Sequence, residues 1–207
     1  MASAHTPILN EIERDFPFTT LQASGIAVGL PPREAGNSEV GHLTIGCGRA
    51  LHHHLPRIIS SIHDGSFFKN EQLTRAITHV KTHGSRLHIA GLISSGSVHS
   101  YINHLYALLD LARREDVAQV YIHAFTDGKD TPQKEGASFI KELEIRCADE
   151  WPNTRVASVI GRFYAMDRDT KWDRIQAAYE LMTQGKGRVV ASISEYLGES
   201  YQQGVSD

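Results

Sequence analysis

Few features of this sequence are typical of a secreted or membrane protein. Its 207 residues include only two cysteines, Cys47 and Cys147, so no disulfide framework is expected and the thiols fit a reducing compartment. No apolar run approaches the roughly 18 residues that span a bilayer. The first residues also lack the charged-then-apolar order of a signal peptide. These absences together predict a cytoplasmic protein.

The charge balance gives no sign of a nucleic-acid or membrane partner either. The formal net charge is −3 with the twelve histidines counted as neutral, and no low-complexity tract or internal repeat occurs. With 41% hydrophobic residues, the chain can build a core, and its length suggests one or two domains.

Apolar runs alternate with helical patterns from about residue 70 onward. A helix is expected over residues 71–82, and apolar runs follow at 88–93, 120–125 and 156–160. Each run is followed by a polar loop and then by a segment with apolar residues at helical spacing. This order predicts an α/β fold, with a parallel sheet and helices on both of its faces.

Several local signals predict where helices begin and end. Thr6 and Pro7 are expected to open a helix, as are Thr131 and Pro132 after the second apolar run. The segment from Trp172 to Met182 shows one apolar stripe and predicts a further helix. Residues 200–207 show no cap and no strand pattern, and we interpret that end as a cut.

Three polar loops come directly after the three apolar runs, at residues 94–100, 126–132 and 161–169. Ligands of open parallel sheets bind outside the carboxyl ends of the strands, so these loops should open onto one edge. Arginine suits phosphate and carboxylate groups, which predicts an anion pocket. The alternative is that acidic and basic residues merely pair on the surface. The candidate residues in the loops are His99, Lys129, Asp130, Arg162 and Arg168.

A glycine-flanked motif, residues 36–42, places Ser38 near the start of an expected helix. Helix N-termini favour bound or covalent phosphate, and a serine becomes a nucleophile when a base or a metal activates it. The alternative, and the commoner role of such residues, is that Asn37 or Ser38 is simply an N-cap.

The motif from Gly36 to Leu43, with Ile45-Gly46 and Gly48-Arg49 after it, resembles the phosphoserine motif of cofactor-independent phosphoglycerate mutases. The similarity covers essentially the whole chain. Further segments that match in the family's order are residues 23–25, 28–31, 64–68, 98–100, 123–125, 127–128, 130–132 and 161–169.

This resemblance implies that 3-phosphoglycerate and 2-phosphoglycerate are interconverted, in glycolysis and gluconeogenesis, through a phosphoserine intermediate. Ser38 would be the nucleophile and a metal ligand, activated by two Mn²⁺ ions. It also implies an N-terminal piece of an alkaline-phosphatase-like metal domain over residues 1–52. Most of a substrate-binding transferase domain would follow over residues 53–207.

The resemblance also gives roles to the loop residues. His99, Arg162 and Arg168 would bind the phosphate and the carboxylate of the substrate. Asp130 would bind the glycerate hydroxyls and shuttle their proton. Lys129 stands where the family usually has arginine, which keeps the charge but loses the planar fork.

The match to the family's metal ligands is incomplete, because only Ser38 is present. We therefore expect this chain alone to have little or no activity. The resemblance also implies that it is a monomer. Ser95 and Ser97 stand where the family has aspartate and glycine, which could loosen the His99 loop. Two alternatives remain: a non-catalytic domain that binds phosphoglycerate or a partner, and a related metal-dependent phosphohydrolase or phosphopentomutase.

Histidines outside these motifs raise a separate metal hypothesis. Residues 52–54 are three consecutive histidines, which point about 100° apart on a helix and cannot easily share one metal. His79 and His83 have the more suitable spacing of four residues. Solvated side chains are the simpler interpretation of both groups.

Overall fold

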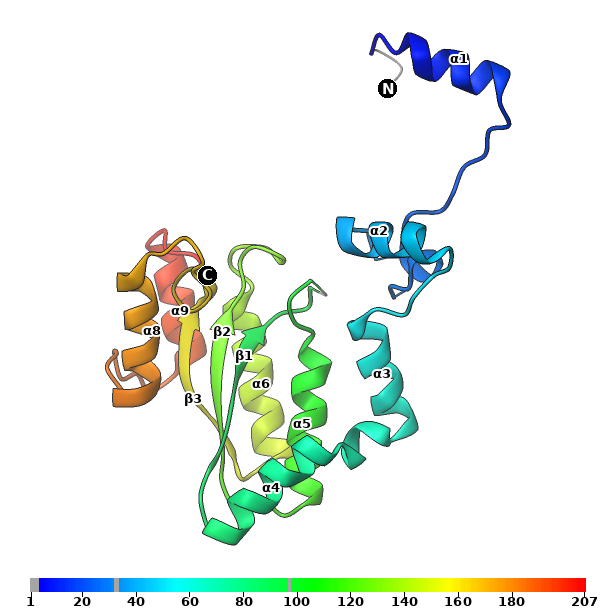
Figure 1. The fold of residues 1–207 in the computed structure, drawn as a ribbon. Coiled ribbons are helices and arrows are strands. Elements are labelled where there is room, and N and C mark those ends of the chain that lie inside the picture. The colour runs from blue at the N-terminus through cyan, green and yellow to red at the C-terminus, as the bar shows by residue number, and fades with distance from the viewer. Residues whose placement is uncertain (1–3, 32–33, 97) are drawn as a thin grey trace. The chain divides into compact units, whose positions relative to one another are not determined.

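The computed structural model describes residues 4–31, 34–96 and 98–207 (Figure 1). The chain divides into two compact units, Met1–Arg57 and Ile58–Asp207, and each is described by itself. Over the described ranges, no helix is both long and apolar enough to cross a membrane.

The first unit consists of short helices and connecting loops. They are α1 (Pro7–Asp15), the 3-10 helix η1 (Gly25–Val28), α2 (Ser38–Cys47) and the first residues of α3 (His54–Asp64). Pro7 opens α1 as predicted, but the Thr6 side chain makes no capping hydrogen bond. Its hydroxyl instead lies 3.4 Å from the Asn10 side chain. A small core is formed by Val28, Leu30 and Val40.

The second unit contains the predicted parallel sheet, with strands β1 (Leu87–Ile93), β2 (Val120–Thr126) and β3 (Thr154–Gly161) in the order β1-β2-β3. Helices surround the sheet (Figure 1). They are η2 (Ser66–Lys69), α4 (Glu71–His83), α5 (Ile102–Arg114), α6 (Gly136–Glu150), α7 (Arg162–Ala165), α8 (Trp172–Gln184) and α9 (Ile193–Gln202).

The central strand shows which face of the sheet carries the core. Along β2, buried residues alternate with half-buried ones, because successive side chains of a strand point to opposite faces. Ile122 and Ala124 on the buried side belong to one core cluster with Ile140 and Leu143 of α6. Fully burying an aliphatic side chain of this size contributes about 1.5–3 kcal/mol. This cluster therefore fixes the strands against α6 and defines where their ends lie.

Three local predictions require correction. The helix expected at Pro132 begins instead at Gly136, because a turn occupies residues 132–135. The segment after Ser200, expected to lack regular structure, is helical through Gln202. Finally, α8 forms as predicted, but Trp172 in its apolar stripe is 73% exposed, and the buried residue of this helix is Ala178.

Candidate functional site

The three predicted loops do meet at one edge of the sheet. The register aligns Ile93 with Thr126 and Thr126 with Gly161, so the three strands end side by side. All three strands are parallel, and each loop leaves from a carboxyl end. This is the edge at which open parallel sheets bind their ligands.

One residue from each loop takes part in a single ionic cluster. The Asp130 carboxylate accepts from His99 Nδ1 at 2.7 Å and from Arg162 Nη1 at 2.9 Å, both on Oδ2. An ionised carboxylate can only accept, so Nδ1 of His99 carries the proton and Nε2 is left for another partner. In the described part of the chain Arg162 uses only Nη1 for hydrogen bonds, so its Nε and Nη2 remain available.

Beneath this cluster lies Asp127, which no sequence argument had assigned a role. Its carboxylate accepts from Arg162 Nη1 and from the Ser94 hydroxyl, both at 2.5 Å, and from the backbone N–H groups of Lys129 and Asp130. Burial raises the pKa of Asp127, but these hydrogen bonds outweigh it and hold the pKa below its ordinary value. Asp127 is therefore a buried anion.

The cluster by itself does not carry the positive charge that an anion pocket needs. Asp127 and Asp130 together balance the single charge of Arg162 and that of His99 if it is protonated. Lys129 and Arg168 are exposed, and neither forms an ion pair within the described ranges. Lys129 and Arg168 are therefore the two predicted cations of these loops that the ionic cluster does not use.

The loop that carries Arg168 is held by a second acidic side chain. Asp167 accepts from the N–H groups of Asp169 at 3.1 Å and Lys171 at 3.0 Å, and from Arg174 Nη1 at 3.0 Å. Thr170 has a positive φ of 60°, which a threonine rarely adopts. These bonds hold the turn closed around that residue.

Ser38 belongs to the first unit, where it is the first residue of α2 and is exposed. Asn37, not Ser38, is the N-cap, because its Oδ1 accepts from the Val40 N–H at 3.1 Å. His42 Nδ1 lies 2.6 Å from the Ser38 carbonyl and 3.3 Å from its hydroxyl. Since Nδ1 must donate to the carbonyl, it cannot also accept the hydroxyl proton. The cap role thus falls on Asn37, and His42 does not activate Ser38 in this arrangement.

The histidines do not assemble a metal site. Across the described residues, no group of three or more His, Cys, Asp or Glu side chains could hold a metal ion. The rings of His79 and His83 stack at 4.1 Å, and His83 Nδ1 lies 2.8 Å from the His79 carbonyl. The donors present therefore do not fit the two-metal centre that the family resemblance implies.

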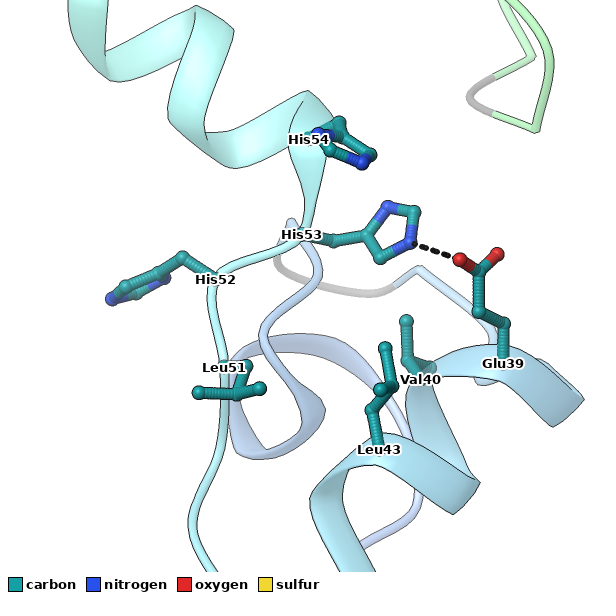
Figure 2. A pocket seen from close by; sticks show the side chains of 7 residues that line it. All are labelled: Glu39, Val40, Leu43, Leu51, His52, His53 and His54. Carbon is teal, nitrogen blue, oxygen red and sulfur yellow. Dashed lines mark ion pairs between the residues drawn. The ribbon is translucent and has the colours of Figure 1, made fainter. Parts of the chain in front are cut away.

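A hollow of about 170 Å³ lies in the first unit, between α2 and the histidines before α3 (Figure 2). Figure 2 shows Glu39 and His53 pointing toward each other, and the Glu39 carboxylate lies 3.5 Å from His53 Nε2. His52 points away from them in the same view, so the three consecutive histidines do not converge. The lining residues are Glu39, Val40, Leu43, Leu51, His52, His53 and His54.

Two serines of the first loop, Ser95 and Ser97, differ from the family pattern. Ser95 is exposed, whereas Ser97 lies outside the described residues. Ser94 is 1% exposed and also accepts from the Gly96 N–H at 2.9 Å, so it joins this loop to Asp127. Ser94 is the polar residue directly after the first apolar run, a sequence signal that could have identified it, whereas Asp127 comes after Thr126 and lacks that signal.

Comparisons with known proteins agree with the family resemblance. The family model described as "BPG-independent PGAM N-terminus" matches residues 58–207. The chain is 47% identical over 207 residues to the 2,3-bisphosphoglycerate-independent phosphoglycerate mutase of Lachnoclostridium phytofermentans. It is 48% identical over 206 residues to an enzyme of that name, numbered 2, from Methanosarcina barkeri. It covers 100% and 99% of its own length in these matches, but only 40% and 39% of the relatives.

A solved structure of Leishmania mexicana phosphoglycerate mutase, determined at low cobalt concentration, has the same fold. The match has a TM-score of 0.82 and 31% identity, and it covers 99% of this chain and 39% of that one. The fold, the loop order and the matching sequence model agree, and the chain belongs to the family of 2,3-bisphosphoglycerate-independent phosphoglycerate mutases.

Proposed function

We propose that this chain provides the substrate-binding loops of a phosphoglycerate mutase and binds 3-phosphoglycerate and 2-phosphoglycerate at the edge described above. The relatives are named as mutases, and the chain spans about 40% of their length. The observation that carries the proposal is the cluster in which Asp130 joins His99 and Arg162 from three separate loops.

Each residue in the cluster has a group suited to such a ligand. The free Nε and Nη2 of Arg162 offer a fork that matches phosphate or carboxylate. The His99 side chain is partly exposed, and Asp130 holds its Nδ1, which leaves Nε2 for a ligand. Asp130 is a base within reach of the glycerate hydroxyls that would bind there. Lys129 and Arg168, both exposed, supply the excess positive charge.

For Ser38 we propose the role of phosphoryl acceptor, and of ligand to Mn²⁺ in the complete catalytic centre. An unaided serine hydroxyl is a weak nucleophile, and His42 does not activate it. Within the described residues the donors for a metal ion are incomplete, so the other ligands of that centre would have to come from elsewhere.

We further propose that residues 1–52 belong to the metal-binding domain and residues 53–207 to the transferase domain. A monomer in the cytoplasm, with a small phosphorylated substrate and no nucleic-acid or membrane partner, suits a glycolytic enzyme. These relatives are mutases by name and lend no support to a phosphohydrolase or phosphopentomutase.

Isothermal titration of the purified chain with 3-phosphoglycerate tests the binding proposal. Arg162→Ala should weaken binding at least about tenfold, because charge-assisted hydrogen bonds to the ligand are lost. Arg155→Ala is the matched control, since Arg155 is an exposed arginine near the opposite end of β3. Equal affinity of the two variants would contradict the proposed site.

A mutase assay with Mn²⁺ and without bisphosphoglycerate separates binding from turnover. Binding without turnover by both the chain and its Ser38→Ala variant favours a substrate-binding, non-catalytic chain, for which the incomplete metal donor set argues. Turnover that disappears in Ser38→Ala would show that the chain completes a catalytic centre after all.

A further inference from the structure

Three loops with little sequence in common share one buried anchor. The Asp127 side chain is 1% exposed and lies at the end of the central strand. From there it contacts the first loop through Ser94, its own loop through two backbone N–H groups, and the third loop through Arg162. No other carboxylate in the described ranges bonds to residues of all three loops.

Exposure rises stepwise from this anchor toward solvent. Arg162 and Asp130 have side chains that are 12% exposed each, and His99 is 39% exposed. A ligand arriving from solvent would meet His99, Asp130 and Arg162 before it could meet Asp127. Asp127 therefore cannot act on a ligand directly, and any influence it has must pass through these neighbours.

The bonds of Asp127 fix orientation as well as position. Arg162 Nη1 lies between Asp127 Oδ1 and Asp130 Oδ2, which leaves Nε and Nη2 as the groups that can face a ligand. The N–H groups of Lys129 and Asp130 close a turn onto the same Oδ1, which sets the direction of the Asp130 side chain. Binding groups that are locked before the ligand arrives lose less entropy on binding.

We propose that Asp127 is a positioning residue of the phosphoglycerate site, which presents Arg162 and Asp130 to the ligand and is braced by Ser94. This inference rests on the proposed function, because Asp127 would act on the phosphoglycerate site through its neighbours without contacting the ligand. Asp127→Asn is the informative change, because the amide keeps the shape and one acceptor but loses the charge that holds Arg162.

The ligand test is a double-mutant cycle by titration with 3-phosphoglycerate. Asp127→Asn should weaken binding at least about tenfold, and it should weaken binding less when Arg162 is already alanine, because only the effect through Asp130 then remains. A residue that only stabilises the fold would give the same loss in both backgrounds. Asp110→Asn is the control, because Asp110 binds Arg113 and the Trp151 ring N–H, away from the cluster, and should leave the affinity unchanged.

A ligand-free readout keeps the inference separate from the proposed function. The guanidinium ¹⁵N–H signals of Arg162 should show hindered rotation in the original chain and lose it in Asp127→Asn. If the Arg162 signals show hindered rotation but the chain does not bind 3-phosphoglycerate, the proposed function is wrong while Asp127 still holds Arg162 in place. The positioning role would be overturned if Asp127→Asn left the Arg162 signals or the affinity for 3-phosphoglycerate unchanged. It would also be overturned if Asp127→Asn caused the same loss of affinity with Arg162 present and with Arg162→Ala.

Discussion

At the scale of single residues, the site depends on carboxylates that are kept ionised in partly or fully buried positions. Removing an aspartate from water favours its neutral form, and only hydrogen bonds to the charged form can reverse that preference. Asp127 shows the reversal, with a pKa below its ordinary value despite its burial. Its charge therefore contributes to stability as well as to the arrangement of Arg162.

The first prediction concerns how this stability depends on pH. Because the pKa of Asp127 is lower in the folded chain than the unfolded value of about 3.9, the unfolded chain binds the proton first as the pH falls. The contribution is complete above about pH 5 and is lost as the pH falls through the folded pKa. Urea unfolding between pH 6 and 3 should show a shallower decline for Asp127→Asn, and parallel declines would refute it.

A second residue-scale prediction concerns His123, which lies between two other polar side chains. Its Nε2 is 2.9 Å from His88 Nδ1, and its Nδ1 is 2.7 Å from the Ser158 hydroxyl. Burial, and then the charge of His88, lower the pKa of His123. NMR titration should place it below the ordinary value of about 6.5, and stability should decrease as the pH falls below that value. His88→Ala should raise the pKa of His123, and an unchanged value would argue against the coupling.

At the scale of elements, α6 shows how a helix start is decided from outside the helix. The Gly136 N–H donates to the Asp207 carboxylate at 2.8 Å, and the Ala137 N–H donates to the Tyr201 hydroxyl at 3.0 Å. These partners satisfy N–H groups that the first turn of a helix leaves unpaired. The prediction that α6 begins at Pro132 was wrong because the local Pro signal was outweighed by these long-range contacts.

The third prediction uses the cysteine on α6 as a probe of that packing. Cys147 is buried in the core cluster, and burial raises its pKa to about 11, whereas Cys47 on α2 is exposed. The thiolate is the reactive form, so a maleimide at neutral pH should label Cys47 quickly and leave Cys147 unlabelled. Cys47→Ser is the control and should abolish the fast phase. Fast labelling of two thiols in the folded chain would show that α6 is not packed as described.

At the scale of the whole molecule, the core and the metal donors can be considered separately. Residues of the three strands and of α4, α5, α6 and α9 contribute to one hydrophobic cluster in the second unit. The described residues offer no group of three His, Cys, Asp or Glu for a metal ion. Folding of the second unit should therefore not depend on a metal.

The fourth prediction concerns the effect of metal ions on the stability of the folded chain. A ligand that binds the folded chain raises its thermal midpoint, and the stabilisation grows with the logarithm of the ratio of ligand concentration to Kd. Micromolar Mn²⁺ should leave the midpoint unchanged, and a chelator should not lower it. Thermal scans followed by circular dichroism provide the measurement, with Mg²⁺ as the control ion. A midpoint that rises with Mn²⁺ but not with Mg²⁺ would reveal a site that the donor geometry does not show.

The sequence alone determined the three strands and the helices α4, α5, α6 and α8 that alternate with them, because apolar periodicity follows from burial and needs no knowledge of the partners. It also placed His99, Asp130 and Arg162 after the carboxyl ends of three strands at one edge, since parallel strands direct these ends the same way, although Arg162 begins the short helix α7 instead of lying on a loop. Only the tertiary structure decided that Asp127 and Ser94 lie beneath them, that Trp172 faces outward, and where α6 begins. Those outcomes depend on contacts between residues far apart in the chain, which no local pattern encodes.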